Sequence, residues 1–342
     1  MTAREARNAR AAGAARRTYL CLEGQRHKPS DYEITTTGLL YYPARGFEVE
    51  TPVWQHYVDY QRGSALSCPR WESFEDPEHT TYSTYVAKRR DQETFLDRLF
   101  EQLVRPLAPG LRPLLGVLSA LRFPLHGWQM TAAYIGSLAP SGRITVAALF
   151  QAADELRRIQ RVCQWLSRSG LATAELDALG RELWQQHPAF QPLRRLCEEL
   201  LVTYDWGEAL IGLNGVIKPV FDRLLFEHVA ALARRHDDEL LAQTLKSLGE
   251  DGRWHEAWSG QLLALVVESE PANVPVLAAS LGRFRRPALE ATQALLGAIS
   301  DFLQDGGALR AAQDDLRLAL ERRISALEGD ASRGGASLGS SA

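Results

Sequence analysis

One charged stretch inside an otherwise apolar helix has residue types and a spacing that could bind a metal. Residues 151–166 read QAADELRRIQRVCQWL, and Glu155 is followed three residues later by Arg158. A Glu and a His at positions i and i+3 of a bundle helix project inward together and bind the iron atoms of oxygen-activating di-iron sites. Here an arginine, which is permanently cationic and has no free lone pair, stands where the histidine would be. The helix has the pattern of a metal-binding helix without its nitrogen ligand.

The predicted faces of this helix separate its two carboxylates. With about 100° between successive residues, one apolar stripe runs along the helix. The stripe consists of Ala148, Ala152, Leu156, Ile159, Cys163 and Leu166. Glu155 falls within this stripe, whereas Asp154 lies on the opposite side with Arg161 and is expected in solvent. An interior carboxylate is costly unless it is paired, protonated or metal-bound, and Arg158 is placed to form an ion pair with Glu155.

No histidine of the chain completes a Glu-x-x-His motif. Among the eight histidines, only His79 has a carboxylate three residues before it, and that carboxylate belongs to Asp76. Asp76 precedes Pro77, and this order predicts the start of a helix with Asp76 as its N-cap. A di-iron carboxylate enzyme needs two such motifs on separate helices. The sequence therefore predicts no catalytic, cofactor-binding or metal-binding residue in this chain.

A second informative stretch, YDWGEALIGLNGVIKPV, spans residues 204–220. Glu208 has largely apolar neighbours on its helix face, so it is interpreted as a buried hydrogen-bonded carboxylate; a remnant or working metal ligand is the alternative. Gly207, Gly212 and Gly215 each cost a helix about 1 kcal/mol relative to Ala. Three glycines within nine residues predict that another helix approaches closely.

Other catalytic patterns are weak or absent. His255 lies between Trp254 and Trp258, which could indicate a stacked site, but a packed or surface histidine is the preferred interpretation. The sequence contains no Gly-rich phosphate loop after a strand and no Gly-x-Ser-x-Gly elbow. Phosphate-loop and serine-hydrolase chemistry are therefore not indicated.

Helical periodicity dominates the chain after its first 75 residues. No convincing strand follows residue 60. The predicted helical ranges are 78–105, 111–138 with an interruption at Pro124, 144–166, 175–186, 192–204, 205–235 with a kink at Pro219, 238–268, 274–303 and 308–327. Long helices joined by short breaks predict an all-α bundle.

Composition sets broad limits on function. The chain has 342 residues and a formal net charge of −3, so no global attraction to nucleic acid or anionic lipid is expected. Its four cysteines have no Cys-x-x-Cys spacing, which argues against common zinc modules and fits a cytoplasmic location. The sequence contains no run of about eighteen apolar residues, so no membrane span is predicted.

Both ends of the chain are expected to lie outside the bundle. Residues 1–18 form a basic tail without the apolar core of a signal peptide and are predicted to be disordered. Residues 329–342 are rich in Gly and Ser and are also predicted to be disordered. Residues 19–70 lack a helical period and contain many aromatic side chains, which predicts an extended arm over the chain's own core or a partner's.

Four stretches together resemble a known family. HKPSDYEI at 27–34, WESFEDPEHTTYSTYV at 71–86, the helix at 151–166 and YDWGEALIGLNGVIKPV at 204–220 occur in this order. They resemble the β subunit of the hydroxylase of bacterial multicomponent di-iron monooxygenases, in the toluene and alkene monooxygenase branch. The resemblance covers roughly residues 19–325. Its more specific motifs are D-W-G-E-A with the downstream Lys218-Pro219, and Asp76-Pro77.

The resemblance implies a fold and a function. Residues 71–328 would form a ferritin-like, ribonucleotide-reductase-like bundle within an (αβγ)2 hydroxylase, as a non-catalytic β subunit that scaffolds the α subunit. The α subunit would carry the di-iron centre and hydroxylate or epoxidise toluene-like aromatics or alkenes with NADH and O2. Hydroxylase α and γ subunits, an effector protein, a reductase and a Rieske ferredoxin are the implied partners. Glu155, Arg158 and Glu208 would be degenerate ligand positions.

Two other functions remain open at this point. The chain could be a stand-alone di-iron oxidase with the unusual ligands Glu93, Glu155, Glu208 and His255, which would have to converge within about 4 Å of two metals. It could also be a helical scaffold unrelated to oxygen chemistry. If the resemblance holds, the aromatic-rich residues 19–60 should be buried across a partner subunit.

Overall fold

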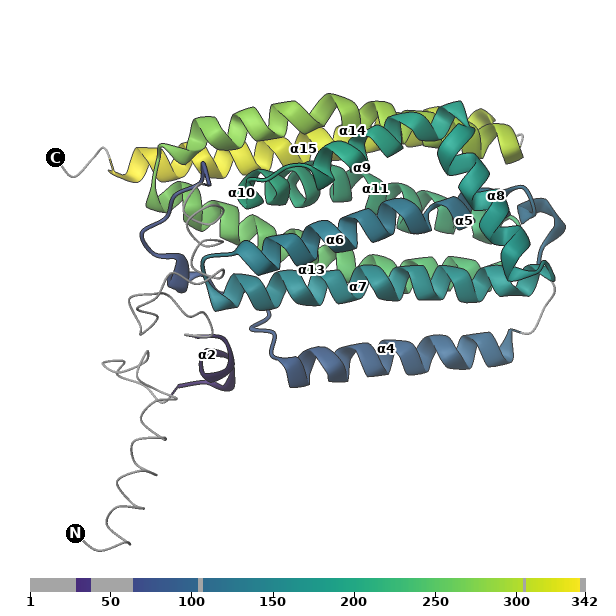
Figure 1. Cartoon of the computed structure of the whole chain (residues 1–342), viewed down its shortest axis with the longest axis horizontal. Helices are drawn as coiled ribbons and strands as arrows, with labels where there is room; N and C mark the ends of the chain where they lie inside the picture. Colours follow the sequence, from purple (N-terminus) through teal and green to yellow (C-terminus); the bar gives the residue numbers. More distant parts are fainter. Residues whose placement is uncertain (1–28, 38–63, 104–106, 304–305, 339–342) are drawn as a thin grey trace, which may run out of the picture.

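Long helices lying side by side form the body of the molecule. The computed structural model describes residues 29–37, 64–103, 107–303 and 306–338, and every regular element in these ranges is helical. The longest helices are α4 (Tyr82–Gln102), α6 (Arg122–Leu138), α7 (Gly142–Leu166), α13 (Glu239–Ser269), α14 (Asn273–Leu303) and α15 (Gly306–Leu338). They run along the longest axis of the molecule (Figure 1). The predicted all-α bundle is confirmed.

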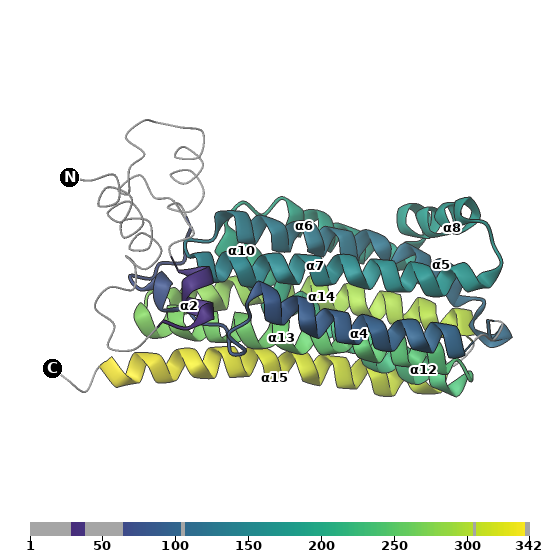
Figure 2. The same cartoon turned by 90° about the horizontal axis from the view of Figure 1, so that it is seen from below.

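Shorter helices complete the bundle. They are α5 (Leu114–Ala120), α8 (Thr173–Gln186), α9 (Gln191–Leu201), α10 (Trp206–Leu210), α11 (Lys218–Arg223) and α12 (Ala230–Arg235). α8 packs on α5 at one end of the molecule (Figure 2). Among the described helices, none is long and apolar enough to pass through a membrane.

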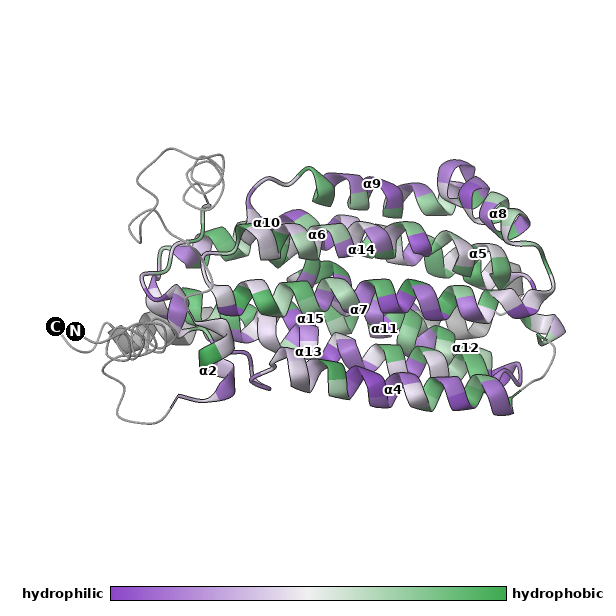
Figure 3. Cartoon of the chain, turned by 60° about the horizontal axis from the view of Figure 1, so that its bottom comes forward, coloured by the Kyte–Doolittle hydropathy of each residue, from purple (hydrophilic) through white to green (hydrophobic). Residues whose placement is uncertain are grey.

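Helix α7 is enclosed by other helices on several sides. α6 and α13 pack against it, and side-chain hydrogen bonds join it to α4. Hydrophilic residues are frequent on α4 and α8, at the margin of the bundle, whereas hydrophobic residues are frequent in the helices between them (Figure 3). The fully buried large side chains include Trp128, Trp165, Trp206 and Trp258. Any charged residue on the inner faces of α7 is therefore cut off from water.

The predicted start of the first long helix is wrong. α4 begins at Tyr82, with Thr81 as N-cap, and the hydroxyls of Thr81 and Thr84 bond reciprocally to the backbone N–H of the other residue. In this reciprocal cap the backbone N–H groups of both Thr81 and Thr84 are hydrogen-bonded. Pro77 has no backbone N–H and could not take part in such a cap. Asp76 is instead buried in the preceding loop. Its carboxylate accepts hydrogen bonds from the backbone N–H of Glu78 at 3.0 Å and of Thr80 at 2.8 Å, and from Trp254 Nε1 at 3.2 Å.

The two prolines act differently from the predicted interruption and kink. Pro124 lies in the first turn of α6, where backbone N–H groups have no partner within the helix, so its missing N–H costs no hydrogen bond. The break between α5 and α6 comes earlier, at Leu121. Pro219 is the second residue of α11. On either side of α11 the backbone is π-helical, over Ile211–Ile217 and Leu224–Val229. A π-helical turn contains an extra residue, and such turns are frequent at functional sites.

The described part of the predicted arm packs on this chain's own core. α2 (Asp31–Thr36) places Tyr32 in a buried position, where its ring stacks on His79 with centroids 5.1 Å apart. Leu66 and Cys68, at the end of the arm, are also buried in the core. Residues 19–28 and 38–63 lie outside the described residues, as does the predicted basic tail 1–18. Burial of the arm across a partner stays a prediction.

The last helix is longer than predicted. The sequence placed the boundary of a disordered tail at Gly329, but α15 continues to Leu338. Helix propagation adds one hydrogen bond for each residue fixed, so an established helix can extend through a sequence of weak helix formers. Residues 339–342 lie outside the described residues.

Two glycines permit the close approach that the sequence predicted. A Cβ atom at Gly212 would lie 2.7 Å from a ring carbon of Phe284, and one at Gly215 would lie 3.2 Å from Leu281. Phe284 and Leu281 both belong to α14, so the prediction that another helix approaches here is confirmed. Gly207 differs, because its Cβ would meet Leu66 from the segment that precedes α4.

We predict that Gly212→Ala lowers the free energy of unfolding by about 1–3 kcal/mol, because the added methyl group would force Phe284 away. Gly282→Ala in α14 is the matched control, since a Cβ there meets nothing within 4 Å. The control should stabilise the protein by about 0.5–1 kcal/mol through helix propensity. Urea unfolding measures both effects, and equal changes would contradict the predicted packing.

Candidate functional site

Helix α7 carries a group of buried charges. Its buried charged residues between positions 154 and 161 are Asp154, Glu155, Arg157, Arg158 and Arg161. Asp154, Glu155 and Arg158 have no exposed surface at all. A charge in such a place is stable only when it is paired and hydrogen-bonded, because removal from water costs several kcal/mol for each ion.

Glu155 forms the predicted ion pair. Arg158 Nη1 donates to Glu155 Oε1 at 3.0 Å and to Oε2 at 3.1 Å. Lys218 Nζ, from the start of α11, also donates to Glu155 Oε1. Asp222, one turn after Lys218, lies 3.0 Å from Arg158 Nη1 and 3.2 Å from Lys218 Nζ. Two carboxylates and two cations therefore close a ring of ion pairs.

Asp154 is not in solvent, and the prediction for it is wrong. Its carboxylate accepts hydrogen bonds from the hydroxyl of Tyr85 at 2.8 Å and from Arg89 Nε and Nη2, each at 2.6 Å. His255 Nε2 lies 3.0 Å from Asp154 Oδ2, the oxygen that Arg89 Nη2 also binds. Tyr85 and Arg89 belong to α4 and His255 to α13. The face of α7 that a single helix would expose is covered by these two helices.

Asp251 of α13 completes the inner set of carboxylates. It forms ion pairs with Arg89 Nη1 and Arg157 Nη1, each at 2.6 Å. Burial and the nearby charge of Asp154 raise the pKa of Asp251 to about 6, while Arg89 and Arg157 oppose this shift. For Asp222, the charges of Arg158 and Lys218 outweigh burial and lower the pKa. Asp251 therefore holds its proton more tightly than a free Asp, and Asp222 holds its proton more weakly.

His255 lies between the two groups of ion pairs. It is 1% exposed, and burial together with the nearby charges of Lys218 and Arg158 lowers its pKa well below the ordinary value. The ring is therefore neutral at pH 7. Since the carboxylate of Asp154 accepts hydrogen bonds, Nε2 carries the proton, and Nδ1 is left as an acceptor. Nδ1 has no hydrogen-bond partner among the described residues and lies 3.9 Å from Glu155 Oε1.

These contacts define a buried charge cluster whose charges balance. Its acidic members are Asp154, Glu155, Asp222 and Asp251, and its basic members are Arg89, Arg157, Arg158 and Lys218. The four negative charges equal the four positive charges, and His255 is neutral. Salt-bridged side chains that are largely shielded from water stabilise a single arrangement of helices. They offer no activated nucleophile and no exposed general base, so the cluster is suited to structure.

The residues of the cluster do not fit a di-iron centre. Each Glu155 oxygen that a metal would require is already bound by Arg158, and one is also bound by Lys218. Neither cation has a lone pair for a metal while it is charged. Within the described ranges, no three His, Cys, Asp or Glu side chains are grouped so that they could hold a metal ion.

The structure does not gather the four ligands of the alternative di-iron hypothesis. Glu155 and His255 are close, but Glu93 binds Arg157 and Arg161 at the edge of the cluster. Glu208 is half-buried, not enclosed as predicted, and it pairs with Arg283 of α14 at 2.6 Å. Its position on the first turn of α10 points it toward α14, which explains the error.

Sequence reasoning missed several members of the cluster, namely Arg89, Arg157, Asp222 and Asp251. One usable signal was present: Lys218 and Asp222 are spaced i, i+4 in an otherwise apolar helix, a spacing that favours an ion pair. A second was Gly252, which directly follows Asp251. A Cβ atom at Gly252 would collide with Asp222 and lie 3.2 Å from Arg158 Nη2. Only a residue without a side chain leaves room for this ion pair.

Comparison with known proteins assigns the chain to a family. A family described as Methane/Phenol/Alkene Hydroxylase matches residues 45–270. The chain belongs to this hydroxylase family. It is 32% identical over 304 residues to the β subunit of the hydroxylase component of the toluene-4-monooxygenase system of Ectopseudomonas mendocina, with 83% of this chain and 90% of that protein covered.

Other members of the hydroxylase family support the assignment. The chain is 30% identical over 226 residues to the oxygenase component MhpL of phenol 2-monooxygenase from Acinetobacter pittii, covering 60% of this chain and 65% of that protein. A structure of toluene 4-monooxygenase with toluene in its resting active site matches with a TM-score of 0.70 and 30% identity, covering 80% of this chain and 94% of that one. Xenon-pressurised phenol hydroxylase from Pseudomonas sp. OX1 shares the fold, with a TM-score of 0.79 at 18% identity over 91% and 94% of the two chains.

These comparisons confirm the predicted hydroxylase β-subunit family, its toluene monooxygenase branch and the ferritin-like helical bundle. They exclude a helical scaffold unrelated to oxygen chemistry. The chain is a component of an enzyme of the monooxygenase class. The charge cluster lies within the bundle of a hydroxylase-family subunit, on the helix whose pattern first indicated a metal site.

We predict that Arg158→Met lowers the free energy of unfolding by about 3–5 kcal/mol, because Glu155 and Asp222 would then share a single cation. The double change Glu155→Leu with Arg158→Met removes one charge of each sign and leaves Lys218 paired with Asp222. It should therefore cost less than Arg158→Met alone. Urea unfolding of the full chain measures Arg158→Met, Glu155→Leu and the double variant against wild type.

Arg286→Met is the control for the loss of an arginine, because Arg286 forms an exposed i, i+4 pair with Glu290 and should contribute nothing measurable. If the loss of unfolding free energy in the double variant equals the sum of the losses in Glu155→Leu and Arg158→Met, then Glu155 and Arg158 do not depend on each other.

The pKa shifts predict an unusual pH profile. Asp251, with its raised pKa, stabilises the folded state below pH 4 and loses this contribution as the pH rises through about 6. His255, with its lowered pKa, contributes stability above pH 6.5 that is lost as the pH falls. The two groups therefore change the free energy of unfolding in opposite directions as the pH falls below 6.5. In Asp251→Asn only the histidine slope remains, so its stability should fall by about 1.4 kcal/mol per pH unit on acidification relative to wild type.

Urea unfolding at several pH values between 4.5 and 7 tests this profile. The slope of stability against pH is the readout, since the substitution also changes the absolute stability. Parallel profiles for wild type and Asp251→Asn would show that the two buried groups do not have these pKa values.

Proposed function

We propose that this chain is the non-catalytic β subunit of a multicomponent di-iron monooxygenase, and that it scaffolds a catalytic α subunit. The observation that carries the proposal is the occupation of both Glu155 oxygens by Arg158 and Lys218. In this proposal the iron and the oxygen chemistry belong to the partner subunit, and Glu155, Arg158 and Glu208 of this chain bind no metal.

The substrate and partners follow from the relatives. The substrate of the α subunit is proposed to be a toluene-like aromatic or an alkene, oxidised with NADH and O2. Hydroxylase α and γ subunits would form the complex in the cytoplasm, with an effector protein, a reductase and a Rieske ferredoxin as further components. Relatives that are named as hydroxylase components of toluene and phenol monooxygenases support this assignment.

A row of exposed apolar side chains on one face of α7 supports a structural role in a complex. Leu149 and Leu156 are each 44% exposed and lie seven residues apart, so they share one face of the helix, and Cys163 continues it. Leu156 and Cys163 both belong to the apolar stripe that the sequence predicts for the interior, so this part of the prediction is wrong. Phe95 on the neighbouring α4 is also exposed, at 47%. Apolar side chains that stay in solvent in a lone chain are typical of subunit interfaces.

We predict that the full chain purified alone contains far less than one iron atom per polypeptide and has no NADH-dependent oxygenase activity. Co-expression with its neighbouring gene products should yield a complex that contains iron and oxidises toluene. In that complex Glu155→Gln, if it assembles, should leave the iron content unchanged. Two tightly held iron atoms with oxidase activity in the lone chain would contradict the proposal.

A further inference from the structure

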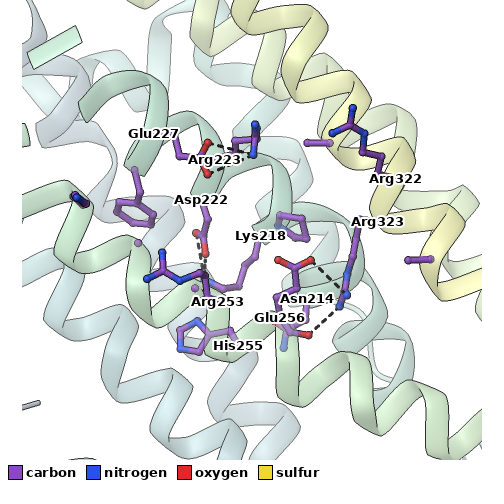
Figure 4. Close-up of a pocket in the computed structure, with 17 residues that line it drawn as sticks. Asn214, Lys218, Asp222, Arg223, Glu227, Arg253, His255, Glu256, Arg322 and Arg323 are labelled. Atoms are coloured by element: carbon purple, nitrogen blue, oxygen red, sulfur yellow. Dashed lines mark hydrogen bonds and ion pairs between the residues drawn. The ribbon is translucent and has the colours of Figure 1, made fainter. Parts of the chain in front are cut away.

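A cavity of about 550 Å³ opens between α11, α13 and α15, on the side of the charge cluster that faces α15 (Figure 4). This volume is in the range of cavities that hold small molecules. Lys218 and His255 of the charge cluster line it, together with residues of α15. Neither the buried ion pairs nor the proposed scaffold role accounts for this cavity.

Cations outnumber anions in the cavity wall. The cationic lining residues are Lys218, Arg223, Lys246, Arg253, Arg322 and Arg323. The anionic ones are Asp222, Glu227 and Glu256. Lys218 and Arg223 are also paired with carboxylates outside the lining, Glu155 and Asp315. The charge that the cavity offers to a small anion therefore depends on the cations that have no such partner.

Two of the cations are not neutralised by the protein. Lys246 and Arg322 are exposed, and neither forms an ion pair or a hydrogen bond with the residues that the structure describes. Arg253 is 74% exposed, and its contact with Glu250 is 3.8 Å long. A guanidinium binds phosphate oxygens in a bidentate manner and an ammonium binds them as a point charge, so Arg322 and Lys246 are both suited to bind the oxygens of an anion.

A further unsatisfied polar atom belongs to the cavity lining. His255 is 1% exposed, and its Nδ1 accepts no hydrogen bond from any described residue. A lone pair on a buried neutral ring requires a donor, which an anion with a protonated oxygen, or the water that accompanies it, can provide. The lining residues therefore include cations that can bind charged oxygens and a buried histidine whose Nδ1 has no donor among the described residues.

We propose that this cavity binds a small, multiply charged anion of the phosphate class. Its limited volume and the three carboxylates in its wall disfavour an extended polyanion such as nucleic acid. The proposal does not depend on the scaffold role, because it rests on the lining of the cavity alone.

Isothermal titration of the full chain with inorganic phosphate, at constant ionic strength, tests the site. One anion should bind per chain, and sulfate should compete whereas chloride should not. Lys246→Gln and Arg322→Gln should each weaken binding about tenfold, and together about a hundredfold, as expected for the loss of independent charge-assisted hydrogen bonds. Both side chains are exposed and unpaired, so unchanged thermal unfolding will show that the variants are folded.

Arg317→Gln is the matched control, because Arg317 is a cation of α15 outside the cavity lining; it should leave phosphate affinity unchanged. Unaltered binding in the double variant, or equal loss in Arg317→Gln, would overturn the proposal. So would displacement of phosphate by chloride at equal ionic strength. If the chain binds phosphate alone but not in the purified hydroxylase complex, a partner segment occupies the cavity and the assignment to a small anion is wrong.

Discussion

The interior of this bundle depends on the balance of buried charge. Asp154 and Glu155 have no exposed surface, and each would be strongly destabilising without a cation beside it. Arg89 and Arg158 supply two of these cations. Arg158 lies on α7 itself, but Arg89 comes from α4, and Lys218 of α11 also binds Glu155. Because these two cations belong to other helices, the requirement for charge balance fixes how α4 and α11 lie against α7. Removing one member would leave its partner buried and unpaired, so the cluster acts as a unit.

The same balance explains how a bundle with the pattern of a metal protein can be complete without metal ions. Two ferrous ions carry four positive charges, and four carboxylates could be neutralised by them. In this chain Arg89, Arg157, Arg158 and Lys218 supply the same positive charge. The buried cations occupy the carboxylate oxygens that a metal would need. In the proposed scaffold role, amino-acid side chains would perform the electrostatic part of a metal's structural role.

The sequence predicted the contacts that lie within one helix and failed for those between helices. The Glu155–Arg158 pair was predictable because both residues are on α7, one turn apart. Asp154 was assigned to solvent because one helix considered alone does not show that α4 and α13 cover its other face. Asp251 binds Arg157 across 94 positions of sequence, and no local pattern encodes that distance. The bundle, the close approach at the glycines and the family were predicted, since each depends on periodicity or on contiguous motifs.

The most direct test of the central claim is an anomalous difference map at the iron edge, from crystals of this chain soaked in ferrous iron. The account predicts no peak near Glu155 and His255, with Arg158 and Lys218 still bound to the Glu155 carboxylate. A pair of iron peaks at this carboxylate, with Lys218 displaced, would show that the cations are replaceable and would contradict the account.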